Sequence, residues 1–202
     1  MKVARPAATA AVLRPRRAPD LAVSHSTVAA ATKEAITAYI GIGANLGDPL
    51  EQVTSAIAAL ATLPMTRLLG TSSAYRSAPM GGMRDDSQPD YVNAVVRIQT
   101  LLDARTLLDR LLDIENRHGR FRSFPNAPRT LDLDLLLFGE QQIDQPGLCV
   151  PHPRMHLRRF VLDPLIEIAP DLYIPGQGAV ARLATATLDQ AVERIARQGP
   201  GV

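Results

Sequence analysis

The feature that most restricts the fold is the order in which strand-like and helix-like apolar patterns follow one another between residues 38 and 138. Patterns typical of strands occur in four segments: 38–43, 66–75, 91–99 and 131–138. Helical spacing occurs at 49–63 and again after Asp103, which can cap a second helix that Gly119 would end. The predicted order is therefore strand, helix, strand, strand, helix, strand.

That order is the split βαβ arrangement of a ferredoxin-like sandwich in the α+β class. After a turn at Gly139 and a histidine-bearing loop at 151–159, helical spacing predicts further helices at 160–168 and 188–197. The apolar runs are far shorter than the roughly 20 residues that cross a bilayer. We therefore expect a ferredoxin-like βαββαβ sandwich with additional C-terminal helices, and not a membrane protein.

Residues 1–36 differ in composition from the rest of the chain. They contain eleven alanines and six basic residues against two acidic ones, without an apolar stripe. We interpret residues 1–36 as a disordered N-terminal extension and residues 37–202 as the folded domain. A mis-assigned start and an arginine-rich transit peptide are the alternatives for the extension.

The folded part restricts the chemistry by what it lacks. It carries 16 arginines, 18 acidic residues and no lysine, because the only two lysines are Lys2 and Lys33. A phosphate-binding loop of the Walker type needs a lysine and is excluded. The near-balanced charge does not favour nucleic-acid binding. The single Cys149 excludes an internal disulfide and a cysteine-based zinc cluster. A bound phosphate would be held by arginines, backbone amides or a metal ion.

Two carboxylates on one predicted strand are the strongest chemical signal. Residues two apart on a strand face the same side about 6.6 Å apart, so Asp132 and Asp134 share one face while Leu131, Leu133, Leu135 and Leu137 face the core. Their mutual repulsion would be relieved by divalent cations, and two Mg²⁺ ions suit oxygen ligands at this spacing. The alternative is a solvated strand face with acids paired to arginines.

Groups that could bind a nucleotide or a flat ring lie nearby in the sequence. Arginine side chains bind phosphate oxygens through two parallel hydrogen bonds. Six arginines flank the two aspartates in the sequence: Arg120, Arg122, Arg129, Arg154, Arg158 and Arg159. Glu115 and His152 lie in the same stretches of the chain. Tyr91 and Asn93 share one face of a strand, where a ring could stack and an amide could pair with its edge. The alternatives are ordinary surface arginines, a loop-packing histidine and an ordinary half-exposed strand.

Six ordered segments resemble a known enzyme family. They are AYIGIGANLGDP, SSAYRSAPMGG, QPDYVNAVV, IENRHGRFR, PRTLDLDLLLFG and VPHPRMHLRRFVLDPLIEIAP. Together they resemble the 6-hydroxymethyl-7,8-dihydropterin pyrophosphokinases of folate biosynthesis, which transfer the diphosphate of ATP to the pterin hydroxymethyl group. The resemblance implies that residues 37–202 form a pyrophosphokinase domain with the ferredoxin-like fold.

The resemblance also implies a role for each matching residue. Asp132 and Asp134 would bind two Mg²⁺ ions, and Arg120, Arg122 and Arg129 would grip the phosphates and assist transfer. Glu115, Leu135, His152 and Arg158 align with ATP-site positions, Leu135 through its backbone. The implied pterin-site residues are Tyr91 and Phe160 as stacking rings, Asn93 as hydrogen-bonding reader, and Ser77, Pro79, Met80 and Gly81 as pocket rim.

The chain departs from the family pattern in one loop and leaves rival functions to test. Members often carry a tryptophan in the loop before Pro128; this chain has none, and Phe124 is the candidate replacement. We expect a cytoplasmic, monomeric enzyme that uses ATP, Mg²⁺ and the pterin and binds neither nucleic acid nor membrane. The rivals are a two-metal nucleotidyltransferase and a non-catalytic ferredoxin-like ligand-binding domain.

Overall fold

The computed structural model describes residues 1, 34–79, 88–119 and 130–195. Contacts divide the chain into two units, residues 1–32 and residues 33–202. The elements of the second unit are β1 (Ile36–Ala44), α1 (Pro49–Ala61), β2 (Thr66–Thr71), β3 (Ala74–Ser77), β4 (Tyr91–Thr100), α2 (Ala104–Arg117), β5 (Asp132–Phe138), β6 (Ile143–Gln145), β7 (Leu148–Val150), the 3₁₀ turn η1 (Met155–Leu157), α3 (Arg159–Ile168), β8 (Tyr173–Ile174), β9 (Gly178–Ala179), α4 (Val180–Thr185) and β10 (Val192–Ile195).

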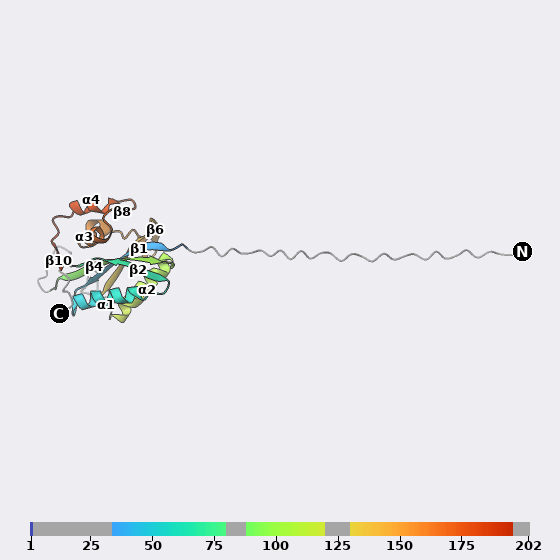
Figure 1. The fold of residues 1–202 in the computed structure, drawn as a ribbon, viewed down its shortest axis with the longest axis horizontal. Helices are drawn as coiled ribbons and strands as arrows, with labels where there is room; N and C mark the ends of the chain where they lie inside the picture. Colours follow the sequence, from blue (N-terminus) through green and yellow to red (C-terminus); the bar gives the residue numbers. More distant parts are fainter. Residues whose placement is uncertain (2–33, 80–87, 120–129, 196–202) are drawn as a thin grey trace. The chain divides into compact units, whose positions relative to one another are not determined.

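An antiparallel sheet of six strands lies at the centre of this unit (Figure 1). The strand order is β10, β3, β4, β1, β5, and β2 pairs with β4 on the same edge as β3. β1 and β4 pair along their whole length, from Ile36 opposite Thr100 to Ala44 opposite Val92. The mixed class with an antiparallel sheet, expected from the alternating patterns, is confirmed.

Helices cover both faces of the sheet, α1 and α2 on one side and α3 and α4 on the other (Figure 1). The core under α1 and α2 includes Ile40, Leu60 and Leu107, all fully buried. A second core, which includes Leu162 and Leu165 of α3, lies on the opposite face. Since strand side chains alternate between faces, one sheet can support both cores.

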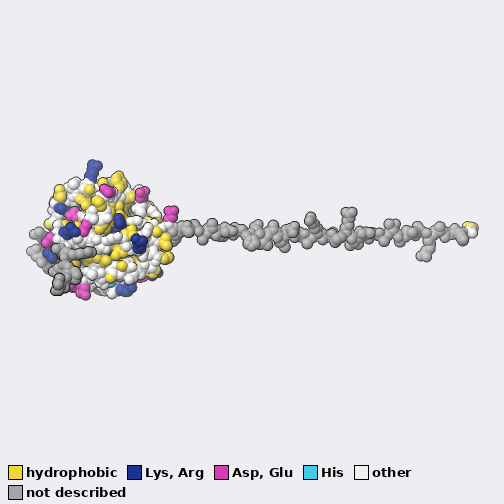
Figure 2. All heavy atoms as spheres, in the orientation of Figure 1, with side chains coloured by type: hydrophobic (Ala, Val, Ile, Leu, Met, Phe, Trp, Pro, Cys, Tyr) yellow, Lys and Arg dark blue, Asp and Glu magenta, His cyan; other side chains and the backbone are white. Residues whose placement is uncertain are grey.

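Charged side chains of both signs are scattered among apolar ones on the face of this unit that Figure 2 shows. Basic and acidic groups alternate there without forming a large patch of one sign. This distribution agrees with the near-balanced charge of residues 37–202 in the sequence.

The first two helices begin where the sequence predicts. The Asp48 carboxylate accepts hydrogen bonds from the amides of Leu50 and Glu51 at 3.1 and 3.0 Å, and Pro49 occupies the first turn. Asp103 caps α2 through the Thr106 amide at 2.9 Å. Gly119 follows α2 with a φ of +76°, a conformation that ends helices and favours glycine.

The predicted strand 66–75 is divided into β2 and β3. Both pair with β4, but Ser72 interrupts the ladder between them. The Ser72 hydroxyl accepts a hydrogen bond from the Val95 amide at 2.9 Å, and the Ser72 amide donates to the Val95 carbonyl at 2.9 Å. A side-chain oxygen thus replaces a backbone carbonyl, which breaks the regular pattern.

The predicted helix at 188–197 is wrong. Val192–Ile195 form β10, which pairs with β3 from Ser77 to Ala74, and the last helix in the described ranges is α4 at Val180–Thr185. The open edge of β3 offers unpaired backbone groups, and this pairing outweighs a weak helical pattern. The hairpin of β6 and β7 was not predicted from the sequence either.

The predicted orientation of Leu137 is also wrong. Leu131, Leu133 and Leu135 lie in the core under α1 and α2, whereas Leu137 lies in the core on the opposite face. A register shift in the pairing of β1 with β5 places Leu135 opposite Ile40 but Leu137 opposite Tyr39. The extra residue, Leu136, reverses the alternation.

Candidate active site

An open pocket with a cavity volume of about 110 Å³ lies on the sheet face that carries α3. Segments far apart in sequence form its walls, and the lining residues are Gly41, Ile42, Gly43, Ser77, Ala78, Tyr91, Asn93, Ala94, Asp132, Asp134, Leu136, Arg158, Phe160 and Val161. Seven of the predicted site residues are among them: Ser77, Tyr91, Asn93, Asp132, Asp134, Arg158 and Phe160.

Two glycines of β1 leave space in this pocket. Gly41 lies opposite Asp134 on β5, and Gly43 lies opposite both Asp132 on β5 and Asn93 on β4. A Cβ atom at Gly43 would lie 3.4 Å from the Asn93 Oδ1 atom. Any larger side chain there would occupy the space between the amide and the carboxylates. Sequence reasoning missed both glycines; their two-residue spacing, matched to Asp132 and Asp134, was the available signal.

Asp134 lies beside two basic side chains. Its Oδ2 atom is 3.7 Å from the His152 Nε2 atom and 3.8 Å from the Arg158 Nη1 atom. The side chain of Asp134 is 35% exposed, whereas those of His152 and Arg158 are about half as exposed. This end of the pocket therefore presents a carboxylate that could bind a metal ion and a guanidinium that could bind a phosphate.

Burial and neighbouring cations keep His152 uncharged. Burial is the main cause that lowers the pKa of His152, the charges of Arg158 and Arg154 lower it further, and Asp134 opposes the shift. The Nδ1 atom accepts a hydrogen bond from the Arg154 amide at 3.2 Å, so the ring proton lies on Nε2, on the side of Asp134.

The Asn93 amide has a fixed orientation. Its Nδ2 atom donates to the Ser77 hydroxyl at 3.0 Å and to the Tyr75 carbonyl at 3.4 Å, and both Asn93 and Ser77 are buried. The Oδ1 atom lies on the side of Gly43, toward the pocket. Because the nitrogen is engaged, the amide presents a hydrogen-bond acceptor to a ligand.

Two aromatic rings line the pocket from different elements. Tyr91 begins β4, and its hydroxyl accepts a hydrogen bond from the side-chain amide of Gln88 at 3.2 Å. Phe160 lies in the first turn of α3, and the Arg158 guanidinium lies over its ring at 5.7 Å from the centroid. This distance permits a cation–π interaction.

Four predicted residues are described but do not line the pocket: His152, which lies beside Asp134, and Glu115, Leu135 and Pro79. Glu115 is buried on α2, and its Oε1 atom accepts a hydrogen bond from the Leu133 amide, between the two aspartates, at 2.7 Å. Glu115 therefore braces the strand that carries the carboxylates. Leu135 is buried in the core under α1 and α2, as its predicted inward orientation requires. Pro79 follows β3 just outside the lining.

The remaining predicted residues lie outside the described part of the chain: Met80, Gly81, Arg120, Arg122, Arg129 and the candidate loop aromatic Phe124. A second hollow with a cavity volume of about 350 Å³ lies between the start of β1, the start of α2 and the β6–β7 hairpin. None of the predicted site residues that the structure describes lines it.

The donor atoms of the first pocket fit magnesium in kind. Mg²⁺ commonly binds one or two carboxylates and takes its other ligands from water and substrate phosphates. Asp132 and Asp134 lie two residues apart on one strand and both line the pocket. Within the described ranges, no group of three or more His, Cys, Asp or Glu side chains is placed to hold a metal ion.

Comparisons with known proteins agree on one family. The family model described as 7,8-dihydro-6-hydroxymethylpterin-pyrophosphokinase (HPPK) matches residues 39–170. The chain is 45% identical over 160 residues to 2-amino-4-hydroxy-6-hydroxymethyldihydropteridine pyrophosphokinase of Haemophilus influenzae, covering 79% of this chain and 98% of the relative. It is 45% identical over 157 residues to the protein of that name from Pseudomonas aeruginosa, covering 78% and 95%.

Solved structures share the fold at low sequence identity. A crystal structure of HPPK-DHPS in complex with substrates has a TM-score of 0.61 and 13% identity, covering 77% of this chain and 44% of that one. Plasmodium falciparum HPPK-DHPS wild type with SDX-DHP has a TM-score of 0.60 and 12% identity, covering 77% and 45%. This chain therefore spans less than half the length of those proteins.

Proposed function

Since the chain belongs to the 7,8-dihydro-6-hydroxymethylpterin-pyrophosphokinase family, we propose that the pocket lined by Gly43, Asn93 and Asp134 is its active site. The chain is an ATP-dependent pyrophosphokinase of folate biosynthesis. It transfers the diphosphate of ATP to the hydroxymethyl group of 6-hydroxymethyl-7,8-dihydropterin and leaves AMP. One observation carries the placement: stacking rings, an oriented amide and two carboxylates from β4, α3 and β5 meet in one pocket.

The pterin is placed between Tyr91 and Phe160. Both rings line the pocket, and a flat bicyclic ring such as the pterin can stack on aromatic faces. Asn93 Oδ1 would accept a hydrogen bond from an N–H group on the pterin edge, because the Ser77 hydroxyl holds the amide in that orientation. Ser77, Pro79, Met80 and Gly81 would form the rim on the β3 side.

ATP is placed at the end of the pocket that carries Asp134. Asp132 and Asp134 would hold the two Mg²⁺ ions, whose charge would offset that of the polyphosphate. Arg158 would contribute a further positive charge. The neutral His152 ring would donate a hydrogen bond from its Nε2–H group at the same end of the pocket. Arg120, Arg122 and Arg129 are the proposed partners for the transferred phosphates. Glu115 would keep β5 in place through the Leu133 amide.

The reaction then requires positioning more than proton transfer. The pterin hydroxyl oxygen forms a bond to the β-phosphorus, the bond from that phosphorus to the α,β-bridging oxygen breaks, and AMP leaves with the bonding pair. The hydroxyl proton passes to solvent or to a phosphate oxygen. Holding the two substrates in line and neutralising the phosphate charge supply most of the acceleration in such transfers.

A product analysis tests the reaction and its rivals. The chain is incubated with ATP, Mg²⁺ and the hydroxymethyl-dihydropterin, and the nucleotides are separated by anion exchange. AMP with a pterin diphosphate is expected. ADP would indicate attack at the γ-phosphorus, pyrophosphate with an adenylylated pterin would indicate a nucleotidyltransferase, and no turnover would indicate a non-catalytic binding domain.

Several finer properties belong to the same proposal. The ferredoxin-like βαββαβ topology is supported by the order β5, β1, β4 and then β2 with β3, with α1 and α2 on one face. We assign residues 37–202 to the pyrophosphokinase domain and residues 1–36 to an extension whose last residue, Ile36, begins β1 opposite Thr100. The enzyme is proposed to be a cytoplasmic monomer with two small-molecule substrates. No helix in the described ranges is long and apolar enough to cross a membrane.

A further inference from the structure

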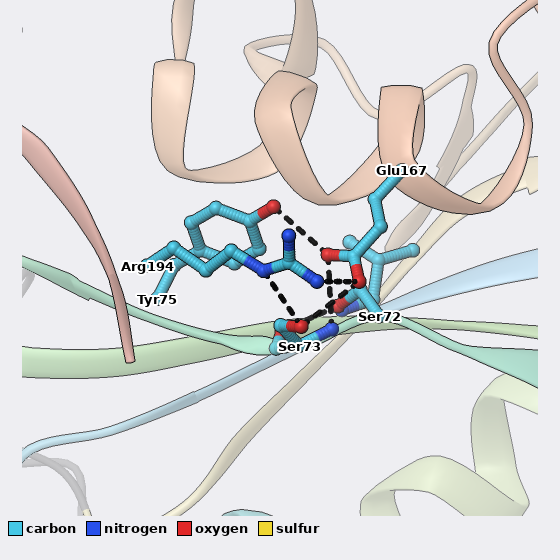
Figure 3. Close-up of polar contacts among 6 residues, drawn as sticks. Ser72, Ser73, Tyr75, Glu167 and Arg194 are labelled. Atoms are coloured by element: carbon cyan, nitrogen blue, oxygen red, sulfur yellow. Dashed lines mark hydrogen bonds and ion pairs between the residues drawn. The ribbon is translucent and has the colours of Figure 1, made fainter. Parts of the chain in front are cut away.

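A polar cluster joins α3 to the edge of the sheet, outside the pocket (Figure 3). One oxygen of Glu167 accepts hydrogen bonds from the Ser73 amide at 3.0 Å and the Tyr75 hydroxyl at 2.8 Å. The other accepts from the Ser73 hydroxyl and from Arg194 Nη2, each at 2.9 Å. Arg194 Nε donates to the same Ser73 hydroxyl at 2.9 Å. The cluster therefore links α3, β3 and β10.

The cluster keeps Glu167 charged and Tyr75 neutral. Burial by itself raises the pKa of Glu167, but the hydrogen bonds from Tyr75 and Ser73 and the charge of Arg194 outweigh it, so the pKa is lowered. Burial, followed by the hydrogen bond to Glu167, raises the pKa of Tyr75. Hydrogen bonds to a charged carboxylate are stronger than those to a neutral group, and Glu167 accepts four of them. This cluster is therefore well suited to fix the separation between α3 and β3.

The elements that this cluster joins are also two walls of the pocket. Glu167 lies in the last turn of α3, and Phe160 in its first turn lines the pocket about 10 Å along the helix. Tyr75 lies on β3, two residues before Ser77, which also lines the pocket. A shift of α3 relative to β3 at the cluster would therefore move Phe160 relative to Ser77.

The segment from Leu188 to Ile195 ties the same two elements at a second place. Gln190 Nε2 donates to the Leu157 carbonyl at 2.8 Å, and Gln190 Oε1 accepts from the Arg159 amide at 3.0 Å, at the start of α3. β10 then pairs with β3, with Val192 opposite Ser77. The start of α3 is therefore held near the pocket, while Glu167 and Arg194 hold its end.

We infer that Glu167 is a positioning residue for the pterin: with Ser73, Tyr75 and Arg194 it holds α3 at the separation from β3 that lets Phe160 stack on the bound ring. Glu167 itself touches no substrate in this assignment. The inference rests on the proposed placement of the pterin against Phe160. Of the described groups placed at the ATP end, Asp134 and His152 lie on and after β5, and only Arg158 adjoins α3, so ATP binding depends less on this separation than pterin binding does.

The test is the Glu167→Gln variant of the full chain. Glutamine keeps the volume but loses the charge, and its NH₂ group would face donors such as the Tyr75 hydroxyl or Arg194. Isothermal titration calorimetry should show a dissociation constant for the hydroxymethyl-dihydropterin about tenfold higher, equivalent to about 1.4 kcal/mol. The dissociation constant for Mg-ATP should change less than about twofold, and kcat at saturating pterin less than about threefold, since the reacting groups are unaltered.

Matched variants separate positioning from general damage. Glu193→Gln makes the same chemical change on β10, in an exposed ion pair with Arg76 at 3.3 Å, and should leave both dissociation constants unchanged. Tyr75→Phe removes one donor and should raise the pterin constant about threefold, a smaller loss because three donors to Glu167 remain. If Glu167→Gln does not fold, the Tyr75→Phe result decides.

The outcomes also distinguish this inference from the proposed function. Phe160→Ala is titrated in parallel and should weaken pterin binding. If Phe160→Ala weakens binding but neither Glu167→Gln nor Tyr75→Phe does, the positioning role is refuted and the pterin placement stands. Equal weakening of pterin and ATP binding in Glu167→Gln would also refute it, as a general structural effect. If Phe160→Ala leaves pterin binding unchanged, the proposed placement of the pterin against Phe160 is wrong, and the positioning role of Glu167 that rests on it fails too.

Discussion

Replacing Asp134 by asparagine should separate the catalytic value of this carboxylate from its structural value. Asparagine has almost the same shape but no charge. At an effective dielectric constant of 20, unit charges 3.8 Å apart, the distance from Asp134 to Arg158, attract by about 4 kcal/mol. Because the Asp134 side chain is 35% exposed, solvent screening reduces the pair to about 1 kcal/mol or less. The free energy of unfolding should therefore fall by no more than about 1 kcal/mol.

The effect on turnover should be much larger. If Asp134 helps to neutralise the transferring phosphates, its loss should lower kcat/KM by at least about 100-fold, equivalent to about 2.7 kcal/mol of transition-state stabilisation. The pKa of His152 should also fall further, since Asp134 is the neighbour whose charge raises it. Urea unfolding, the AMP-release assay and NMR titration of the histidine measure these three quantities.

A matched control is available on α2. Asp113→Asn makes the same chemical change in an exposed ion pair with Arg110 at 3.5 Å and should leave kcat/KM unchanged. The reasoning would be refuted if Asp134→Asn kept more than about a tenth of the activity. It would also fail if the variant lost about 3 kcal/mol or more of stability, because the carboxylate would then be structural.

The glycine of the pocket, the N-terminal extension and the Glu167 cluster each lead to a further prediction. Gly43→Val should weaken pterin binding more than ATP binding, because a Cβ at Gly43 lies 3.4 Å from Asn93 Oδ1 and the branched side chain would enter the pocket. Calorimetry with each ligand checks this, and an equal loss of affinity for the two ligands would contradict it. Deleting residues 2–33 should change the melting temperature and kcat/KM little, since the extension has no apolar stripe, and a large drop in melting temperature would show that it packs on the domain. Because the pKa of Glu167 is lowered in the folded state, its contribution to the free energy of unfolding is complete above pH 4.5, the ordinary value, and is lost as pH falls through the lower folded pKa. The free energy of unfolding of Glu167→Gln should therefore depend less steeply on pH in that range, and identical pH profiles for the two proteins would contradict the assignment.

Much of the fold could be predicted because local residues decide it. Asp48 and Asp103 cap helices that begin next to them, and Gly119 ends α2 with a positive φ that glycine accepts at little cost. The alternation in β4 and β5 identifies strands whatever they pair with. The grouping of Asp132 with Asp134, and of Tyr91 with Asn93, follows from the strand period alone.

Pairing partners decided what local patterns could not. Residues 192–195 form a strand because the edge of β3 is available to them, and Leu137 changes face because a bulge against β1 inserts Leu136. Ser72 divides one predicted strand in two because Val95, which lies 23 residues away in sequence, is opposite its hydroxyl. In each case the deciding partner is distant along the chain, and its position depends on the whole sheet.

The sequence by itself determined the order of strands and helices from residue 38 to residue 138, apart from the division of strand 66–75, together with the cap of α2, the acidic pair and the family to which the chain belongs. Only the tertiary structure brought β4, β5 and α3 together around one pocket, with Gly41 and Gly43 leaving room between the Asn93 amide and the carboxylates. It also decided that Glu167, Ser73, Tyr75 and Arg194 form a single cluster. The physical reason is that hydrogen bonds and excluded volume act over a few ångströms in space, whereas sequence patterns report only neighbours along the chain.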